Sequence, residues 1–219
     1  MSMGLKIASI GVATVAIAST VFAAGVYYVN NVEHPRYTVV IGDEDIEIRA
    51  YPRLVVAEVT HSGDRRGAVN TAFSPLADYI FAKRGGGDSI AMTAPVTQER
   101  RPIAMTAPVT QERSGESPDG SSWRVRFIMP SAYTLEMLPR PADADVAINV
   151  VPSARRAAIR FSGVATDELV AAKEHRLREW LTGRGFSSDG PATYAYYNAP
   201  FTPGPMRRNE IWIGMQDAN

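Results

Sequence analysis

The order of strand-like and helix-like segments is the feature that most constrains the fold of this chain. From residue 37 onward, several runs with strand periodicity precede one helical pattern, and the same order of strands, helix and strands then returns. A repeated order of this kind favours an α+β fold. It predicts two similar halves that share an antiparallel sheet, with one helix from each half covering a face.

The first half begins with three predicted strands, over Tyr37–Ile41, Ile46–Tyr51 and Leu54–Val59. The turn sequence GDED separates the first two, and in the second strand isoleucines alternate with Glu47 and Arg49. This alternation is typical of a hairpin with one buried and one solvent-exposed face. The acidic residues of the turn are expected to be solvated.

A helical pattern follows over Arg65–Phe81, where apolar residues recur at spacings of three and four: Ala68, Val69, Ala72, Phe73, Leu76, Ile80 and Phe81. Pro75 interrupts this pattern and removes one backbone hydrogen bond, so a kink or a restart is expected near Ser74. The glycine run Gly85–Gly87 then closes the unit.

The second half contains the clearest helix of the chain, over Asp167–Leu181. Thr166 is a suitable N-cap, and Gly183 stands where the chain must leave the helix. The buried stripe of this helix is expected to be Leu169, Val170, Leu177, Trp180 and Leu181. The accompanying strands are predicted over Trp123–Met129, Val146–Val151, Ala157–Phe161, Thr193–Tyr197 and Glu210–Met215.

An eleven-residue sequence occurs twice in the chain: IAMTAPVTQER at Ile90–Arg100 is repeated without change at Ile103–Arg113. In strand geometry each copy places an apolar row on one face, which predicts two successive strands. Pro95 and Pro108 cannot donate a ladder hydrogen bond and belong at an edge, a bulge or a strand end. A recent local duplication explains the identity without a functional site. The second copy is either a working strand or part of a duplicated hairpin at the sheet edge.

The N-terminal segment indicates export or membrane attachment. After Lys6 no charged residue occurs until Glu33, and Ile7–Val29 is almost wholly apolar or small. Val21-Phe22-Ala23 suits cleavage by a signal peptidase, whereas the 23 residues of Ile7–Val29 are also enough to span a bilayer as a helix. Residues 1–32 are therefore predicted to be a signal peptide or a membrane anchor. Residues 33–219 are expected to form the folded domain, periplasmic or anchored to the membrane.

Composition excludes several classes of function. Lys plus Arg (23) balances Asp plus Glu (23), so no strong field draws the protein to nucleic acid. Cysteine is absent, and the three histidines stand in no metal-ligand spacing. There is also no GxSxG elbow, phosphate-binding loop or dinucleotide fingerprint. The residues therefore give no indication of acid–base or nucleophilic catalysis or of a preformed metal site.

Several separated motifs together resemble the SOUL family of heme-binding proteins. They occur in the family's order, and they are DIEIRAYP (Asp45–Pro52), IAMTAPV, WRVRFIMP (Trp123–Pro130), FSG (Phe161–Gly163), YNAP (Tyr197–Pro200) and RRNEIW (Arg207–Trp212). The resemblance extends from about Tyr37 to Met215. It implies a distorted antiparallel β-barrel made of two βαββ-like halves with two flanking helices, similar to bacterial effector-binding domains.

The resemblance also implies a ligand and a place for it. Members of the family are described as binding heme or other tetrapyrroles in an apolar cleft between the first helix and the loop that carries the Tyr-x-x-Pro segment. In this sequence the cofactor-binding positions are Val69, Asn70, Phe73, Leu76, Ile80, Tyr197 and Phe201. Basic or amide groups near them that are able to reach carboxylates are Arg65, Arg66, Asn70 and Lys83. The alternative is that Phe73, Leu76 and Ile80 belong to the core under the sheet.

One difference from the family concerns the protein ligand of the heme iron. Some members carry a proposed histidine ligand directly after the EIR segment, and Ala50 occupies that position here. An axial histidine is therefore not expected, and heme would be held by apolar contacts or by another ligand such as Met92, His61 or Tyr197. The expected function is non-enzymatic storage, buffering or delivery of a tetrapyrrole outside the cytoplasm. The alternatives are another hydrophobic ligand, a protein partner or a weak hydrolase, although the first helix offers only Asp78 as an acid.

Overall fold

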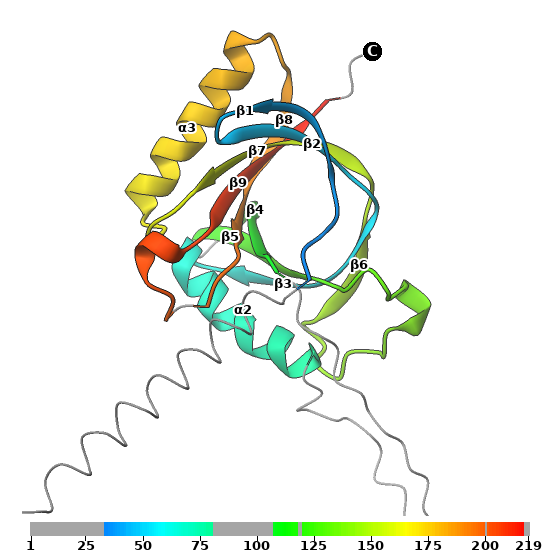
Figure 1. Cartoon of the computed structure of the whole chain (residues 1–219). Coiled ribbons are helices and arrows are strands. Elements are labelled where there is room, and N and C mark those ends of the chain that lie inside the picture. The colour runs from blue at the N-terminus through cyan, green and yellow to red at the C-terminus, as the bar shows by residue number, and fades with distance from the viewer. Residues whose placement is uncertain (1–32, 81–106, 118–119, 200, 217–219) are drawn as a thin grey trace, which may run out of the picture. The chain divides into compact units, whose positions relative to one another are not determined.

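One nine-stranded sheet, curled into a half-barrel, forms the frame of the domain (Figure 1). The structure is a computed structural model that describes residues 33–80, 107–117, 120–199 and 201–216. Every strand pairing within it is antiparallel. Among these residues, two helices lie against the outer side of the curled sheet (Figure 1), so the predicted α+β fold, a distorted antiparallel β-barrel with two flanking helices, is confirmed.

The elements follow the predicted order with shifted ends. The strands are β1 (Thr38–Asp43), β2 (Ile46–Tyr51), β3 (Leu54–Ser62), β4 (Val109–Ser117), β5 (Gly120–Ile128), β6 (Ala147–Val151), β7 (Ala154–Phe161), β8 (Ser188–Tyr196) and β9 (Asn209–Met215). The helices are α2 (Arg65–Ile80) and α3 (Asp167–Gly183), and two short 3-10 turns are η1 (Leu135–Met137) and η2 (Gly204–Met206).

The strand order shows that the two halves are topologically equivalent. Across the sheet the order is β1-β2-β7-β9-β8-β4-β5-β3-β6. If β1 is left out and β2, β3, β4 and β5 are exchanged with β6, β7, β8 and β9, the same order is obtained when it is read from the opposite edge of the sheet. The pair β4–β8 is the seam between the halves. In addition, β2 pairs with β7 and β6 pairs with β3, so each half contributes its first strand to the other half.

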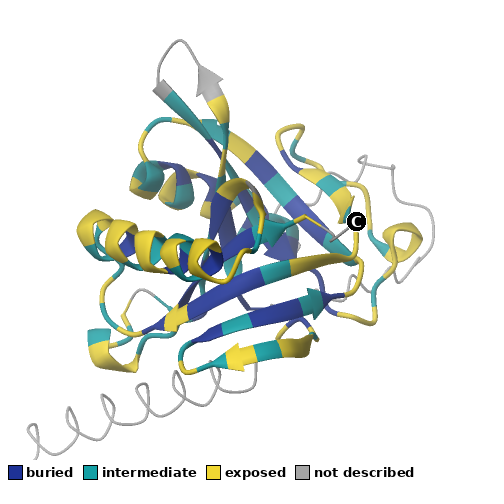
Figure 2. Cartoon of the chain, turned by 90° about the horizontal axis from the view of Figure 1, so that it is seen from above, coloured by how far each residue is buried: buried dark blue, intermediate teal, exposed yellow. Residues whose placement is uncertain are grey.

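The apolar core lies between the outer face of the sheet and the two helices. In Figure 2 the strands are largely buried, whereas the outward turns of the helices are exposed. Under α3 the buried residues are Ile46, Ala157, Ile159, Phe161, Val170, Leu177, Leu181, Ala192, Ile211 and Ile213. Under α2 they are Ala57, Val59, Ala72, Leu76, Ile80, Val125, Phe127, Met129 and Val146. Burial of these two clusters supplies the main hydrophobic stabilisation of the domain.

Helix α3 is positioned by its cap and by the first hairpin. The hydroxyl oxygen of Thr166 accepts a hydrogen bond from the backbone N–H of Leu169 at 3.2 Å, as the predicted N-cap requires. The helix runs through Gly183, and the left-handed turn is made two residues later by Gly185, with φ of 72°. The predicted end of the helix was therefore slightly early. Asp45, in the turn before β2, pairs with Arg176 of α3 at 2.7 Å instead of being merely solvated.

Helix α2 runs as one element across Pro75, so the helix does not restart there. Its fully buried residues recur every four positions, at Ala68, Ala72, Leu76 and Ile80. This spacing places one stripe on the sheet and leaves the neighbouring positions partly outside.

The second copy of the duplicated sequence contributes a central strand. Val109–Arg113 are the last five residues of that copy, and they form the first part of β4, between β8 and β5. The predicted strand covered the apolar IAMTAPV part, whereas the structure places the strand on the polar residues that follow Pro108. The edge-hairpin alternative is therefore wrong for Val109–Arg113. The first copy lies outside the described residues.

The predicted N-terminal signal or anchor also lies outside the described residues. Within the part of the chain that the structure describes, no helix is long and apolar enough to cross a membrane.

Candidate functional site

The inner face of the curled sheet is polar, unlike the outer face. Because side chains alternate along a strand, the neighbours of the helix-packed residues point inward. On β9, Ile211 packs under α3, whereas Glu210 and Trp212 point inside. On β2, Arg49 also points inside and is only 2% exposed. The expectation of a solvent-exposed Glu47/Arg49 face is therefore wrong for Arg49.

Glu210 lies at the centre of a hydrogen-bonded cluster on this inner face and is 1% exposed. Its Oε2 accepts hydrogen bonds from Arg49 Nη1 at 2.7 Å, the Tyr197 hydroxyl at 2.7 Å and Trp212 Nε1 at 2.8 Å. Its Oε1 accepts from Arg208 Nη2 at 2.7 Å and Nε at 3.1 Å. Four side chains thus donate to one carboxylate, which leaves it little capacity to accept a proton from a substrate.

The protonation states in this cluster follow from its burial and charges. Burial raises the pKa of Glu210, but the hydrogen bonds and charge of Arg49 and the charge of Arg208 outweigh burial and lower this pKa to about 2. Burial, together with the charge of Glu210, raises the pKa of Tyr197 above its usual value. Glu210 is therefore ionised and Tyr197 is neutral at physiological pH. A neutral phenol that donates to Glu210 is not available as a tyrosinate ligand for iron.

A second inward-facing cluster joins β3, β4 and β5. Arg126 contacts Glu58 at 2.7 Å and Glu112 at 3.0 Å, and Arg124 contacts Glu112 at 2.9 Å. The Thr193 hydroxyl of β8 also donates to Glu112 at 3.2 Å. Both acids are only partly exposed, so these ion pairs hold the polar strand β4 at the centre of the sheet.

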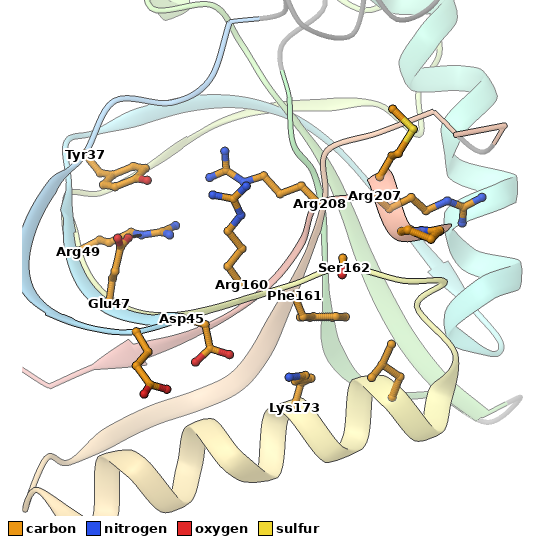
Figure 3. Close-up of a pocket in the computed structure, with 14 residues that line it drawn as sticks. Tyr37, Asp45, Glu47, Arg49, Arg160, Phe161, Ser162, Lys173, Arg207 and Arg208 are labelled. Atoms are coloured by element: carbon orange, nitrogen blue, oxygen red, sulfur yellow. Dashed lines mark hydrogen bonds and ion pairs between the residues drawn. The ribbon is translucent and has the colours of Figure 1, made fainter. Parts of the chain in front are cut away.

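A basin of about 860 Å³ opens beside the Glu210 cluster (Figure 3). The turn before β2, the end of β7, one side of α3 and η2 form its walls. Its charged lining residues are Glu44, Asp45, Glu47, Arg49, Arg160, Lys173, Arg207 and Arg208. The other lining residues are Tyr37, Phe161, Ser162, Leu169, Pro205 and Met206. The volume lies in the upper part of the range of about 300–1,000 Å³ that is usual for small-molecule sites.

Two cations of the basin have no counter-ion within the described part of the chain. Its acids are engaged, since Glu47 pairs with Arg49 at 2.6 Å and the two acids of the turn pair with Arg176 of α3. The side chains of Arg160 and Lys173 make no ion pair and no hydrogen bond with another described residue. Figure 3 shows Arg160 extending from the end of β7 and Lys173 coming from α3. The basin can therefore accept an anion without giving up an internal ion pair.

Comparison with protein families identifies the chain. Residues 32–214 match the family described as SOUL heme-binding protein, which covers most of the sequence. The chain belongs to the SOUL family. The comparison with curated proteins found no match.

Solved structures confirm the fold at low sequence identity. The C-terminal domain of EcmrR superposes with a TM-score of 0.55 at 10% identity, covering 83% of this chain and 99% of that one. A crystal structure of a hydrolase from Listeria innocua gives 0.54 at 12% identity, covering 81% and 94%. At such identities the likeness shows the fold alone, and the SOUL domain therefore has an effector-binding-like architecture.

The positions that the SOUL resemblance assigned to the ligand do not form one group in the structure. Leu76 and Ile80 are buried in the core under α2, and Val69 packs against that core. Phe73 is 40% exposed, with its ring against Phe127 at 5.4 Å between centroids, and Asn70 is exposed.

The remaining assigned positions, Tyr197 and Phe201, lie elsewhere. Tyr197 is buried on the inner face beside Glu210, whereas Phe201 is 74% exposed. Neither the basin nor a smaller pocket of about 300 Å³ near β3 and β5 is lined by any of the seven positions. Of the proposed carboxylate contacts, Arg65 is engaged by Asp167 at 2.5 Å, and Lys83 lies outside the described residues.

The residues of the basin carry little signal in the sequence. Arg160 and Lys173 are single charged positions on a strand and a helix, where a solvated side chain is the usual interpretation. Arg207 and Arg208 belong to the RRNEIW motif, which helped to identify the family but did not reveal their role. The absence of counter-ions was not predictable, because it depends on which acids the folded chain brings close.

Proposed function

We propose that this SOUL protein binds a tetrapyrrole, heme or a close relative, in the basic basin and catalyses no reaction on it. The family supports the ligand class, and members are generally non-enzymatic. The observation that carries the proposal is the pair of uncompensated cations, Arg160 and Lys173, in a basin of about 860 Å³. A porphyrin with two propionates supplies two carboxylates for these cations and a planar apolar body for Phe161, Leu169 and Met206.

The residues of the basin fit the carboxylates and the size of the ligand better than they fit an iron centre. No histidine lines the basin among the described residues. Ala50, at the position of the family's proposed iron ligand, is on the opposite face of β2 from Arg49. Within the described part of the chain, no cluster of three potential metal-ligating His, Asp or Glu residues occurs. We therefore expect the affinity for a tetrapyrrole to depend on contacts with the macrocycle and its carboxylates.

The location of the protein is part of the same proposal. The apolar segment Ile7–Val29 supports export to the periplasm or attachment to the membrane, where a tetrapyrrole-binding domain would store, buffer or deliver its ligand. Mass spectrometry of the mature N-terminus separates a cleaved signal peptide from a retained anchor. An intact N-terminus in a protein recovered from the cytoplasm contradicts both versions.

Hydrolysis is the rival function, because a fold relative from Listeria innocua is described as a hydrolase. A hydrolase on this frame needs a carboxylate that is free to take a proton. Glu210 is the most buried carboxylate on the inner face, and its oxygens are occupied by four donors. The geometry therefore supports ligand binding over hydrolysis.

A hemin titration of the full-length chain tests the proposal. Wild-type protein is expected to give a saturable change of the Soret band, without the spectrum of a bis-histidine complex. The double variant Arg160→Glu/Lys173→Glu places two acids against the propionates and should weaken binding at least about tenfold, since each charge-assisted hydrogen bond contributes about 1.5–3 kcal/mol. Protoporphyrin dimethyl ester, which lacks both charges, should bind as weakly to the wild type.

Two further variants make this test specific. Arg155→Glu changes an exposed arginine on the same strand but on its outer face, and it should leave hemin binding unchanged. Phe73→Asp alters the α2 surface and should also have no effect. If Phe73→Asp loses hemin binding and the double variant does not, the ligand binds at α2 and not in the basin. If the spectrum of free hemin is unaltered by wild-type protein, tetrapyrrole binding is refuted.

A further inference from the structure

The smaller pocket, of about 300 Å³, lies where two of the motifs that identify the family end. Pro52 is the last residue of DIEIRAYP, and Ile128–Pro130 are the last residues of WRVRFIMP. The backbone N–H of Met129 donates to the carbonyl of Val55 at 2.8 Å and joins the end of the second motif to β3. None of the residues that line this pocket lines the basin. The tetrapyrrole site therefore gives these motif ends no role.

The walls of this pocket are largely apolar, and solvent reaches them. Met129 and Pro130 are buried lining residues, whereas Leu54, Val55 and Tyr133 are only half-buried. The volume of about 300 Å³ lies at the lower end of the range of about 300–1,000 Å³ that is usual for small-molecule sites. The basin, with about 860 Å³, is much larger. The smaller pocket is therefore suited to a small organic molecule and not to a tetrapyrrole.

Two arginines of the pocket have no ion-pair partner within the described residues. Arg36 and Arg53 line the pocket and are exposed, and their side chains make no hydrogen bond or ion pair with another described residue. Their charges act on Glu33 and Glu136, but neither acid is close enough to form an ion pair with them. The carboxylate of Glu33 instead accepts a hydrogen bond from the backbone N–H of Ser131 at 2.9 Å. Both guanidinium groups can therefore take an anion without giving up an internal contact.

Tyr133 adds an uncharged donor to the same pocket. Its ring packs against the apolar core under α2, and its hydroxyl makes no hydrogen bond with another described residue. The backbone N–H of Tyr133 donates to the carbonyl of Pro130 at 3.0 Å, so the turn that carries this side chain is closed by its own hydrogen bond. The pocket thus combines two guanidinium groups and one phenol with apolar walls, and all three groups are donors that suit a carboxylate.

We propose that this pocket is a second ligand site and binds a small apolar monocarboxylic acid. Arg36 and Arg53 take the carboxylate, and the body of the acid covers the half-buried Leu54, Val55 and Tyr133. A second acid group on the ligand would lie against apolar walls without a partner, which is costly. An inorganic anion has no body to cover these walls. The site shares no residue with the basin and does not depend on tetrapyrrole binding.

Cyclohexanecarboxylate is a suitable probe, because it joins one carboxylate to a compact apolar body. Cyclohexanecarboxamide has the same shape without the charge, and acetate has the charge without the body. The full-length chain is titrated with each compound by calorimetry at constant ionic strength. Cyclohexanecarboxylate is expected to bind saturably and at least about tenfold more tightly than either control, in line with the strength of charge-assisted hydrogen bonds and of apolar burial. Equal binding of the acid and its amide, or no saturable binding of the acid up to millimolar concentration, overturns the proposal.

Two methionines report on the two sites separately. Met129 lines the smaller pocket and Met206 lines the basin, so the methyl resonances of ¹³C-methyl-methionine protein follow both sites in one sample. Met129→Leu and Met206→Leu assign the two signals. Cyclohexanecarboxylate should shift the Met129 signal and leave the Met206 signal in place, whereas hemin should change the Met206 signal. A shift at Met206 without one at Met129 would place the acid in the basin and refute the second site.

Variants assign the binding to the two arginines. The double variant Arg36→Gln/Arg53→Gln removes both charges and should weaken binding of cyclohexanecarboxylate at least about tenfold, whereas Tyr133→Phe removes one neutral donor and should weaken it by a smaller factor. Arg140→Gln is the matched control, because Arg140 is also exposed but does not line the pocket. It should bind the acid as the wild type does.

The same variants give the outcomes that contradict the assignment. Binding to the double variant at wild-type strength, or an equal loss in Arg140→Gln, refutes it. Since both arginines are exposed, thermal unfolding of the double variant and its response to hemin should match those of the wild type. If the double variant does not fold, Arg36→Gln and Arg53→Gln are titrated singly, and unaltered binding in both then overturns the proposal.

Discussion

On the outer face of β9, Ile211 packs under α3 among other apolar residues, whereas on the inner face of the same strand Glu210 is held by arginine, tyrosine and tryptophan donors. Both residues are almost completely buried. The outer contact is non-directional, so a slightly smaller apolar side chain is tolerated there at moderate cost. The inner contact depends on every partner being present, because a missing carboxylate leaves buried charges without compensation.

This difference explains why an arginine without a counter-ion, Arg160, lies on the inner face of the sheet. An apolar core closes on itself and leaves no unsatisfied group for a ligand. A polar face built from ion pairs can end with unequal numbers of acids and bases, as it does at Arg160 within the described residues. The surplus charges on a rigid sheet are then fixed in place before a ligand arrives, which lowers the entropic cost of binding.

Removal of Glu210 is the strongest test of the comparison between the two faces. Glu210→Ala should lower the free energy of unfolding by about 4 kcal/mol, because it leaves the buried Arg49 and the partly exposed Arg208 without their shared acid. Ile211→Ala on the opposite face should cost about as much through loss of apolar burial and a cavity. Denaturant unfolding measures both values. A cost below about 1 kcal/mol for Glu210→Ala would show that the inner cluster is not a structural element.

Acidification should destabilise the inner face by slightly less than the removal of Glu210 does. The folded-state pKa of Glu210 is lowered from 4.5 to about 2, so the stability that its ionisation contributes is complete above about pH 4.5 and is lost as the pH falls toward 2. The shift corresponds to roughly 3 kcal/mol. Unfolding measured between pH 6 and pH 2 should show this slope in wild type and in Ile211→Ala, but a reduced slope in Glu210→Gln. An equal slope in Glu210→Gln would assign the acid sensitivity to other groups.

The smallest effect is expected from shortening the duplicated sequence. Deletion of Ile90–Pro102 leaves one complete IAMTAPVTQER followed by Ser114, so the sequence of β4 is unchanged. The 26 residues between Ile80 and Ala107 are halved, which changes the loop-closure entropy by only about 0.6 kcal/mol. Thermal unfolding should therefore shift by a few degrees at most.

A scrambled first copy of unchanged length is the control for that deletion, since it separates sequence from length. A loss of several kcal/mol in both variants would mean that the first copy makes stabilising contacts of its own. Equal stability of both variants and wild type would confine the structural role of the repeat to its second copy.

Much of the outer face was predictable from the sequence. The apolar periodicities located both helices, the Thr166 cap and eight of the nine strands within a few residues. The missing strand, β4, is polar because Thr110 and Glu112 point into the half-barrel and Gln111 donates to the Arg65 carbonyl at 2.7 Å. A prediction that assigns polar residues to the solvent cannot recognise a strand whose polar side chains are enclosed by the protein.

The site was less predictable than the fold for the same reason. Leu76 and Ile80 carried a clear apolar signal, but in the structure they form the core, which was the alternative considered for them. Arg160 and Lys173 gave no signal, because an unpaired charge is defined by the absence of acidic neighbours, which only the tertiary structure reveals. Motif order identified the family, whereas it did not identify the charged positions of this chain.

The exchange of first strands between the halves has a consequence for how the domain assembles. Since β2 completes its pairing only with β7, and β6 only with β3, neither half can finish its part of the sheet from its own chain segment. The topology is that of an intertwined dimer whose two subunits have been joined end to end. The sheet therefore closes only after residues about one hundred positions apart have met, and folding is expected to be governed by these distant contacts.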